Sequence, residues 1–185
     1  MRRLTIALAL TIVASAALPS VSGAEVVDAQ PNGFEAKRTA VFNAPADQVY
    51  AALSQPSRWW NKDHTRSGSA ANLSLAPMAG GCFCEKLPKG GSVMHMTVVF
   101  AQPGQALRLF GALGPLQTTG ATGHLAWILS EKDGQTTLTQ TYDVGGYRMG
   151  GLDKLAPAVD KVLDEQFDRL KAYVEAGSAE AGKAP

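Results

Sequence analysis

The two cysteines of the chain, Cys82 and Cys84, are the residues with the widest choice of chemistry. On a β-strand alternate side chains point to the same face, so the two thiols would lie side by side. They could form a disulfide, bind a soft metal ion or fill an apolar wall. Alternate Cα atoms of a strand lie about 6.6–6.8 Å apart, which is the upper limit for a disulfide. We therefore expect reduced thiols buried in the wall of a cavity, and the other two chemistries remain alternatives.

The residues around the cysteines give little support for catalysis or for a metal centre. Glu85 follows Cys84 directly, so we expect its side chain on the opposite face, exposed to solvent. Alternation along the next strand likewise places His95 on the face opposite to Met94 and Met96. No cysteine or histidine pair has the spacing of a zinc site, and there is no G-x-S-x-G nucleophile motif. The sequence predicts no catalytic set, no metal ion and no cofactor.

Aromatic and polar residues supply the candidates for ligand binding. Trp59 and Trp60 are adjacent on a predicted short helix, so we expect only one of them to face inward. Gln140 shares a strand face with apolar residues, where it could anchor a polar group of a ligand or mark the sheet edge. Tyr147 lies between two glycine pairs, in a loop that could gate a cavity or simply connect two elements. The candidate ligand-binding residues are Trp59, Trp60, His64, Cys82, Cys84, Trp127, Gln140, Tyr142, Tyr147 and Phe167.

The N-terminal residues have the three parts of a secretory signal peptide. Arg2 and Arg3 precede an apolar run at 4–18, and the small residues that follow suit cleavage after Ala24. The run has about 15 residues, fewer than the roughly 20 that span a bilayer, so we expect no membrane anchor in the mature chain. The predicted segments are a signal peptide at 1–24, a leader without regular structure at 25–33 and a disordered tail at 177–185. The mature protein would then be periplasmic or secreted.

Composition limits the partners of the mature chain, which would have about 160 residues, the length of one domain. The whole sequence has 17 basic and 16 acidic residues, and the basic ones are scattered. Neither nucleic acid nor an anionic membrane surface would therefore attract it. A chain of this size buries enough surface for a core of its own. We expect a monomer whose partner is a hydrophobic small molecule.

The order of the predicted elements indicates an α+β fold. The strands are expected at 34–43, 72–76, 81–87, 92–102, 106–113, 123–130 and 136–144. Two short helices follow the first strand, and one long helix at 157–176 has apolar residues at helical spacing. Strands joined by short turns form a curved antiparallel sheet of about seven strands, which the long C-terminal α-helix would cover. Such an arrangement can leave a cavity between sheet and helix, where small molecules bind.

Several segments resemble those of a known superfamily in their order and spacing. They are 42–53 (FNAPADQVYAAL), 59–60 (WW), 80–85 (GGCFCE), 103–109 (PGQALRL), 136–139 (TTLT) and the closing helix. Over 34–176 the chain resembles the SRPBCC, or helix-grip, superfamily of START domains, the birch-pollen allergen and aromatic polyketide cyclases. It is most similar to the branch related to the activator of Hsp90 ATPase. The resemblance implies one helix-grip domain, in which the sheet wraps around the C-terminal helix.

The resemblance implies ligand binding but no fixed reaction, because the superfamily includes both lipid carriers and cyclases. We expect an exported protein that binds a hydrophobic or aromatic small molecule between the sheet and the C-terminal helix. One alternative is a polyketide cyclase- or dehydratase-like enzyme that uses a polar residue of the same cavity, such as His64, Gln140 or Tyr142. Another is a metal-handling protein that binds through Cys82 and Cys84. Export would separate this chain from relatives that activate a cytosolic chaperone.

Overall fold

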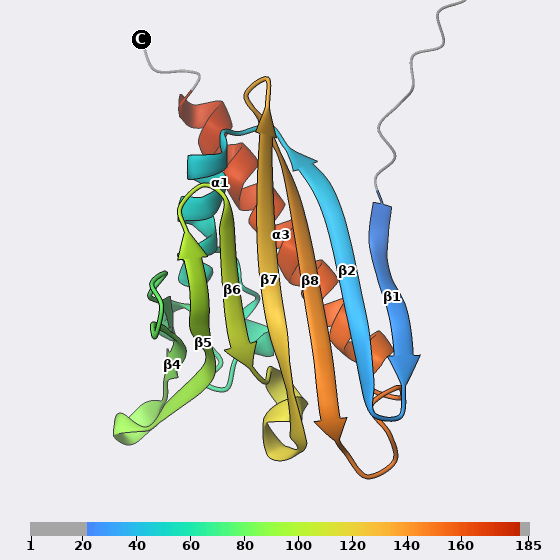
Figure 1. Cartoon of the computed structure of the whole chain (residues 1–185). Helices are drawn as coiled ribbons and strands as arrows, with labels where there is room; N and C mark the ends of the chain where they lie inside the picture. The colour runs from blue at the N-terminus through green and yellow to red at the C-terminus, as the bar shows by residue number, and fades with distance from the viewer. Residues whose placement is uncertain (1–21, 182–185) are drawn as a thin grey trace, which may run out of the picture.

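One antiparallel sheet of eight strands lies against a long helix, α3, which crosses one of its faces (Figure 1). The computed structural model describes residues 22–181, with side chains from 26 to 177. The strand order is β1-β2-β8-β7-β6-β5-β4-β3. This is the α+β helix-grip fold that the sequence predicts, with eight strands where about seven were expected.

The elements have the following bounds. The strands are β1 (Ser22–Gln30), β2 (Gly33–Phe42), β3 (Leu73–Leu75), β4 (Cys82–Lys86), β5 (Ser92–Gln102), β6 (Ala106–Gly111), β7 (Gly120–Lys132) and β8 (Gln135–Tyr147). The helices are α1 (Ala46–Leu53), α2 (Pro56–Trp59) and α3 (Ala156–Ala181). Short 3₁₀ turns are η1 (Lys62–His64), η2 (Ala70–Asn72), η3 (Pro88–Gly90) and η4 (Gly114–Thr118).

Both ends of the described chain are more regular than the sequence predicts. Most of the predicted leader forms β1, which pairs with β2 through contacts such as Val26 with Ala36. An edge strand has a free side in solvent, so it needs no continuous apolar pattern to mark it. Helix α3 runs through Gly177 to Ala181, beyond its predicted end, because one glycine weakens a helix by only about 1 kcal/mol. The predicted signal peptide lies outside the described residues except for its last three positions.

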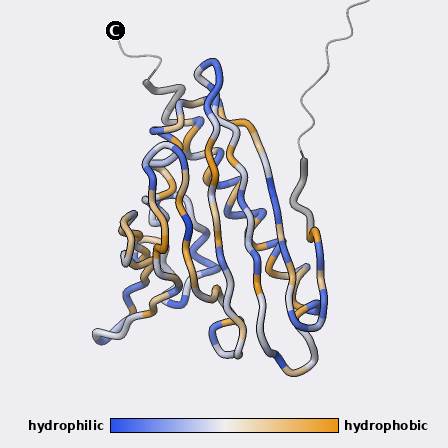
Figure 2. The backbone as a smooth tube through the Cα atoms, viewed as in Figure 1, coloured by the Kyte–Doolittle hydropathy of each residue, from blue (hydrophilic) through white to orange (hydrophobic). Residues whose placement is uncertain are grey.

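The long hairpin of β7 and β8 forms the middle of the sheet. Buried and exposed residues alternate along both strands, as the hydropathy colours in Figure 2 illustrate. The turn between them has Asp133 at φ 53° and Gly134 at φ 75°. Both values are left-handed, as a two-residue type I′ hairpin requires, and Asp-Gly is a favoured pair for it. The turn predicted at this position is confirmed.

Helix α3 is held on the sheet by apolar packing and by one buried arginine. Phe167 of α3 packs edge-on against Phe42 of β2, with ring centroids 5.6 Å apart. Arg38, also on β2, donates hydrogen bonds to Asp164 and Asp168 of α3, and its guanidinium lies 4.8 Å from the Phe167 ring centroid. These contacts fix the half of α3 that follows the pocket described below. Within residues 22–181, no helix has both the length and the apolar character to cross a membrane.

Candidate functional site

A pocket of about 430 Å³ lies between the first half of α3 and the β3–β5 end of the sheet. The loop that follows α2 and the start of η4 complete its walls. Its volume falls within the range of small-molecule sites. The lining residues are Trp60, Asp63, His64, Thr65, Arg66, Leu73, Phe83, His95, Leu113, Gly114, Pro115, Leu155, Ala158, Val159, Val162 and Leu163.

The helix supplies an apolar wall. Val159 and Val162 are three residues apart on α3, and Leu155, directly before the helix, lies four residues before Val159, so the three side chains follow one side of the helix start. Leu163 adds to this wall, and Leu73 of β3 faces the pocket from the sheet. A ligand held here would therefore bury apolar surface on two sides.

Three aromatic rings contact one another, edge-on or tilted, along the sheet side of the pocket. The Trp60 and Phe83 ring centroids are 5.5 Å apart, and those of Phe83 and His95 are 5.2 Å apart. Trp59 is also buried, where its Nε1 donates to the Ala52 carbonyl oxygen at 2.8 Å. The expectation that only one tryptophan faces inward is wrong, because α2 ends at Trp59 and Trp60 has an extended backbone. The two side chains thus leave the chain in directions that one helix could not give them.

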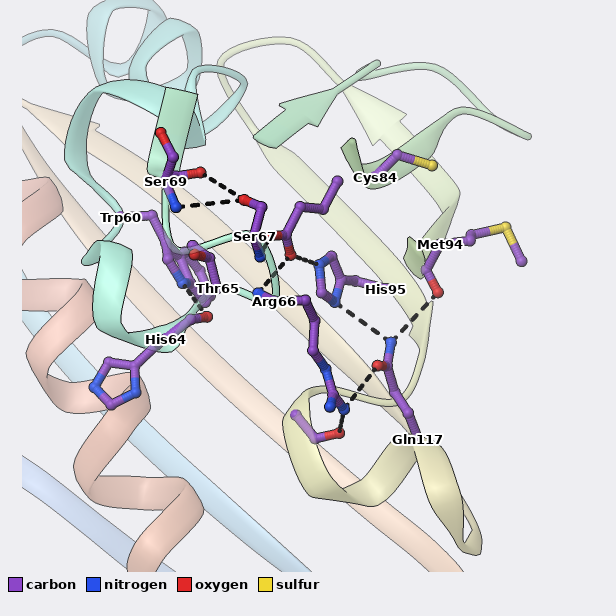
Figure 3. A network of polar contacts seen from close by, with 12 residues as sticks. Trp60, His64, Thr65, Arg66, Ser67, Ser69, Cys84, Met94, His95 and Gln117 are labelled. Carbon is purple, nitrogen blue, oxygen red and sulfur yellow. Dashed lines mark hydrogen bonds and ion pairs between the residues drawn. The ribbon is translucent and has the colours of Figure 1, made fainter. Parts of the chain in front are cut away.

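Glu85 is buried on the inner face of β4, contrary to the prediction that it is exposed. Only 1% of it is accessible, and its carboxylate accepts hydrogen bonds from the backbone amides of Arg66 (3.0 Å) and Ser67. It also lies 2.9 Å from His95 Nε2. Glu85 therefore ties the loop after α2 to the sheet and holds the ring of a pocket-lining histidine (Figure 3).

A bulge in β5 turns His95 to this inner face. Phe83 pairs with Met96 and Cys84 pairs with Met94, so His95 is the extra residue of β5 at this point. His95 and Met96 are consequently both buried, although strict alternation predicts opposite faces for them. Bulges of this kind commonly redirect a side chain next to a functional site.

Burial and hydrogen bonding act in opposite directions on the Glu85–His95 pair. Burial lowers the pKa of His95, and its bond to Glu85 opposes this only in part. Burial tends to raise the pKa of Glu85, but the bonds from Ser67, from the Arg66 amide and from His95 outweigh it and hold the pKa below its ordinary value. At neutral pH the pair is thus a carboxylate and a neutral imidazole that donates through Nε2.

Gln117 joins this pair to Arg66. Its Nε2 lies 3.4 Å from His95 Nδ1 and donates to the Met94 carbonyl oxygen, also at 3.4 Å. Its Oε1 accepts from Arg66 Nη2 at 3.4 Å, and the same Nη2 donates to the Gly114 carbonyl oxygen at 3.0 Å. These contacts position a guanidinium beside a neutral histidine at one side of the pocket (Figure 3).

His64 lies at the α3 side of the same loop. Its Nε2 is 3.0 Å from Glu165 Oε2, and Glu165 also accepts a hydrogen bond from Asn61 Nδ2. The backbone N–H of Asn61 donates to Gln166 Oε1 at 2.7 Å, so the loop is fixed to α3 as well as to the sheet. Among the ten sequence candidates, Trp60 and His64 line the pocket.

Cys82 and Cys84 form a disulfide, so the prediction of reduced thiols is wrong. The strand contracts locally, with 5.4 Å between the two Cα atoms, and the β5 bulge lies opposite this point. The cysteines occupy the face opposite to Phe83 and Glu85, and neither lines the pocket. In Figure 3 Cys84 points away from the Glu85–His95 contacts, towards the side of Met94. With both sulfurs bonded, they supply no thiolate to a soft metal ion.

A family model described as polyketide cyclase/dehydrase and lipid transport matches residues 33–175. The chain belongs to this family. No curated protein matches the chain. Solved structures share its fold at low sequence identity, and three of them are proteins of Rhizobium leguminosarum, Arthrobacter aurescens and Rhodobacter sphaeroides.

The three likenesses cover most of each chain. The Rhizobium protein is 20% identical, with 77% of this chain and 97% of that chain covered and a TM-score of 0.54. The Arthrobacter protein is 15% identical, with 85% and 93% covered and a TM-score of 0.56. The Rhodobacter protein is 19% identical, with 83% and 98% covered and a TM-score of 0.53. Likeness at this level shows the fold alone.

Four other candidates lie in the core of this polyketide cyclase/dehydrase-type domain, outside the pocket lining. Trp127 Nε1 donates to Gln140 Oε1 at 2.8 Å, so the Gln140 carbonyl already has a partner. Tyr142 is fully buried, and its hydroxyl oxygen accepts from the Leu113 amide at 3.2 Å. Burial raises the pKa of Tyr142 to about 12, which leaves it protonated at neutral pH. Phe167 lies on the sheet-facing side of α3, against Phe42. A role for these four residues in binding stays a prediction.

Tyr147 differs from the other candidates, since 74% of it is exposed at the end of β8. It does not line the pocket. Among the described residues, no group of three or more His, Cys, Asp or Glu side chains could hold a metal ion.

Sequence reasoning missed four residues of the site: Arg66, Phe83, Glu85 and His95 all line or support the pocket. Alternation from inward-facing cysteines places Glu85, and with it Phe83, on the wrong side of β4. Arg66 lies in a loop, where no periodic pattern indicates direction. The available signal was Phe83 itself, because a large aromatic residue is usually highly buried, and Glu85 two positions later shares its face.

Proposed function

We propose that this protein binds a hydrophobic or aromatic small molecule in the pocket between the sheet and α3. The observation that carries the proposal is the pocket itself, with an apolar helical wall, three aromatic rings in contact with one another and one polar side. Few but well-positioned polar groups in a largely apolar cavity are typical of small-molecule sites. The family, whose description includes lipid transport, supports the same proposal.

We propose further that the protein acts after export. The support is the N-terminal sequence, in which two arginines, an apolar run and small residues before Glu25 form the three parts of a signal peptide. Mass spectrometry of protein from the periplasm or medium should give a chain that begins at Glu25. An intact Met1 on exported or membrane-bound protein would contradict cleavage.

Ligand binding can be tested with a neutral fluorescent probe, N-phenyl-1-naphthylamine. Ala158 is exposed at the pocket wall, so Ala158→Trp should place a large ring in the cavity without disturbing the core. We expect it to weaken probe binding by about tenfold or more, because the ring occupies the space that the probe needs. The matched control is Ala172→Trp, also exposed on α3 but outside the pocket. Equal probe binding by both variants would contradict the proposal.

A second candidate function, an enzyme of the cyclase or dehydratase type, is favoured by the Glu85–His95 pair. A carboxylate that fixes one ring nitrogen of a histidine leaves the other as a possible base. His95 Nδ1 lies 3.4 Å from Gln117 Nε2, a long contact that a substrate could replace. A substrate with an acidic C–H beside a carbonyl could lose a proton to Nδ1, which is the first step of an aldol-type cyclisation.

Proton exchange gives a direct readout of this second function. The probe is 1-phenyl-1,3-butanedione in D₂O, whose central methylene exchanges faster when a base acts on it. We expect the wild-type protein to accelerate exchange and His95→Gln to abolish the acceleration while the naphthylamine probe still binds. Exchange at the background rate with the wild-type protein would leave binding as its function.

A further inference from the structure

The guanidinium of Arg66 lines the pocket without an acidic partner. Its Nη2 donates to two neutral oxygens, those of Gly114 and Gln117. The ion pairs formed by the side chains of residues 26–177 do not include Arg66. Two other polar side chains of the lining already have partners: His64 contacts Glu165, and Asp63 pairs with Lys62.

The contacts of Arg66 position it without using all its donors. A guanidinium has five N–H groups, and the contacts to Gly114 and Gln117 both involve Nη2. Gln117 is itself held by His95 and by the Met94 carbonyl, so the arginine is oriented by a fixed group. Nη1 and Nε remain to bind a ligand group.

The surroundings of Arg66 favour an anion over a cation or a neutral polar group. The pKa of His95 is lowered, so its ring carries no charge at neutral pH. Its two ring nitrogens face Glu85 and Gln117. Gln117 contacts both the imidazole ring and the guanidinium, so the two groups lie near each other, and the Arg66 charge contributes to the lowering of the His95 pKa. Arg66 is therefore the source of positive charge on this side of the pocket, and the facing α3 wall is apolar.

We infer that the pocket selects an aromatic carboxylate, with its carboxylate on Arg66 and its ring system against Trp60 and Phe83. The planar fork of arginine matches the two oxygens of a carboxylate. Offset or edge-on contact with Trp60 and Phe83, whose centroids are 5.5 Å apart, suits a flat ring. The inference rests on the proposed function, because it names the ligand class of the same pocket.

The test compares two ligands of nearly the same shape, one anionic and one neutral. 2-Naphthoate and 2-naphthamide each displace N-phenyl-1-naphthylamine from the wild-type protein, and their inhibition constants are measured at pH 7.5. We expect 2-naphthoate to bind about 5- to 20-fold more tightly, an advantage typical of a charge-assisted hydrogen bond at a partly exposed site. This advantage should shrink when NaCl is raised from about 0.05 to about 0.5 M, because salt screens the exposed guanidinium.

Variants of Arg66 separate charge from geometry. Arg66→Gln should remove the preference for 2-naphthoate and leave 2-naphthamide unchanged, whereas Arg66→Lys should retain part of it. Arg58→Gln makes the same change of charge on exposed residue 58 of α2, outside the pocket, and should keep the full preference.

The outcomes distinguish this inference from the function on which it rests. Equal affinity for both naphthyl ligands, with the neutral probe bound and displaced, would overturn the carboxylate preference alone. So would a preference that survives in Arg66→Gln. Absence of probe binding to the wild-type protein would overturn the binding function and the inference with it.

Discussion

Glu85 and His95 face the same side of the sheet from neighbouring strands, with 2.9 Å between Glu85 Oε2 and His95 Nε2. The β5 bulge brings the histidine to this side, and successive amides of Arg66 and Ser67 donate to the carboxylate. One buried carboxylate thereby fixes both the histidine and the loop that carries the pocket arginine. Loss of this group should affect stability and the pocket together.

Glu85→Ala should destabilise the protein by about 2–4 kcal/mol, because it leaves two backbone amides and His95 without their buried acceptor. Glu85→Gln keeps the size and one acceptor oxygen, so we expect a smaller loss. Urea unfolding at pH 7.5 measures both. Glu35→Ala, at a partly exposed position of β2, is the control and should change stability by about 0.5 kcal/mol or less. A loss for Glu85→Ala no larger than that of the control would contradict the role of Glu85.

Stability should fall on acidification, in two steps. The pKa of His95 is lowered from 6.5 in the folded state, chiefly by burial, so the unfolded state binds the proton more readily. The stability that neutral His95 contributes is therefore fully present above about pH 6.5 and is lost as the pH falls towards the pKa of His95 in the folded state. The pKa of Glu85 is also lowered, from 4.5, since its hydrogen bonds outweigh the effect of burial. The stability that ionised Glu85 contributes is lost as the pH falls below 4.5 and through the pKa of Glu85 in the folded state.

Urea unfolding between about pH 8 and pH 5 tests the first step. His95→Gln should flatten the loss of stability in this range, because glutamine does not titrate. The exposed His124→Gln is the matched control and should keep the wild-type slope. A wild-type slope in the His95→Gln variant would show that other groups cause the loss.

The Cys82–Cys84 disulfide should be present in the isolated protein. Alkylation of the unfolded protein without reductant should then add no label, and two labels per chain would contradict the bond. The bond closes a very short loop, so it removes little entropy from the unfolded chain. Cys82→Ser/Cys84→Ser should therefore cost only about 1.5 kcal/mol in stability.

The same double variant should weaken probe binding more than its small effect on stability suggests. Without the bond, β4 can relax from 5.4 Å between the two Cα atoms towards the usual strand spacing of about 6.6–6.8 Å. Phe83, which lies between the cysteines and lines the pocket, would shift with it. Unchanged affinity for N-phenyl-1-naphthylamine would show that the disulfide does not shape the pocket.

Gln140→Met should reduce stability but leave probe binding intact. The substitution removes the acceptor of the buried Trp127 Nε1, and an unsatisfied donor of this kind costs about 1–3 kcal/mol. Neither residue lines the pocket. Weaker probe binding with unchanged stability would instead assign Gln140 to the ligand. Gln30→Met, exposed on β1, is the control for the change of side chain.

The helix-grip fold could be predicted from the sequence, because the order of elements, the Asp133-Gly134 turn and the long C-terminal helix are all visible in it. These features depend on local periods and on turn residues, which a single chain displays directly. Trp60 and His64 were also found from the sequence as residues that line a pocket, although their binding of a ligand stays a prediction.

The faces of β4 and β5 that turn inward could not be predicted from the sequence and became visible only in the folded structure. Facing depends on register, and a shift of one residue moves a side chain to the other face of the sheet. The extra residue at His95 makes that shift, and the pairing of β5 with β4 defines it, which no local pattern encodes. For this reason the cysteines, expected in the cavity wall, lie outside it as a disulfide, while Glu85 and His95 take the inner side.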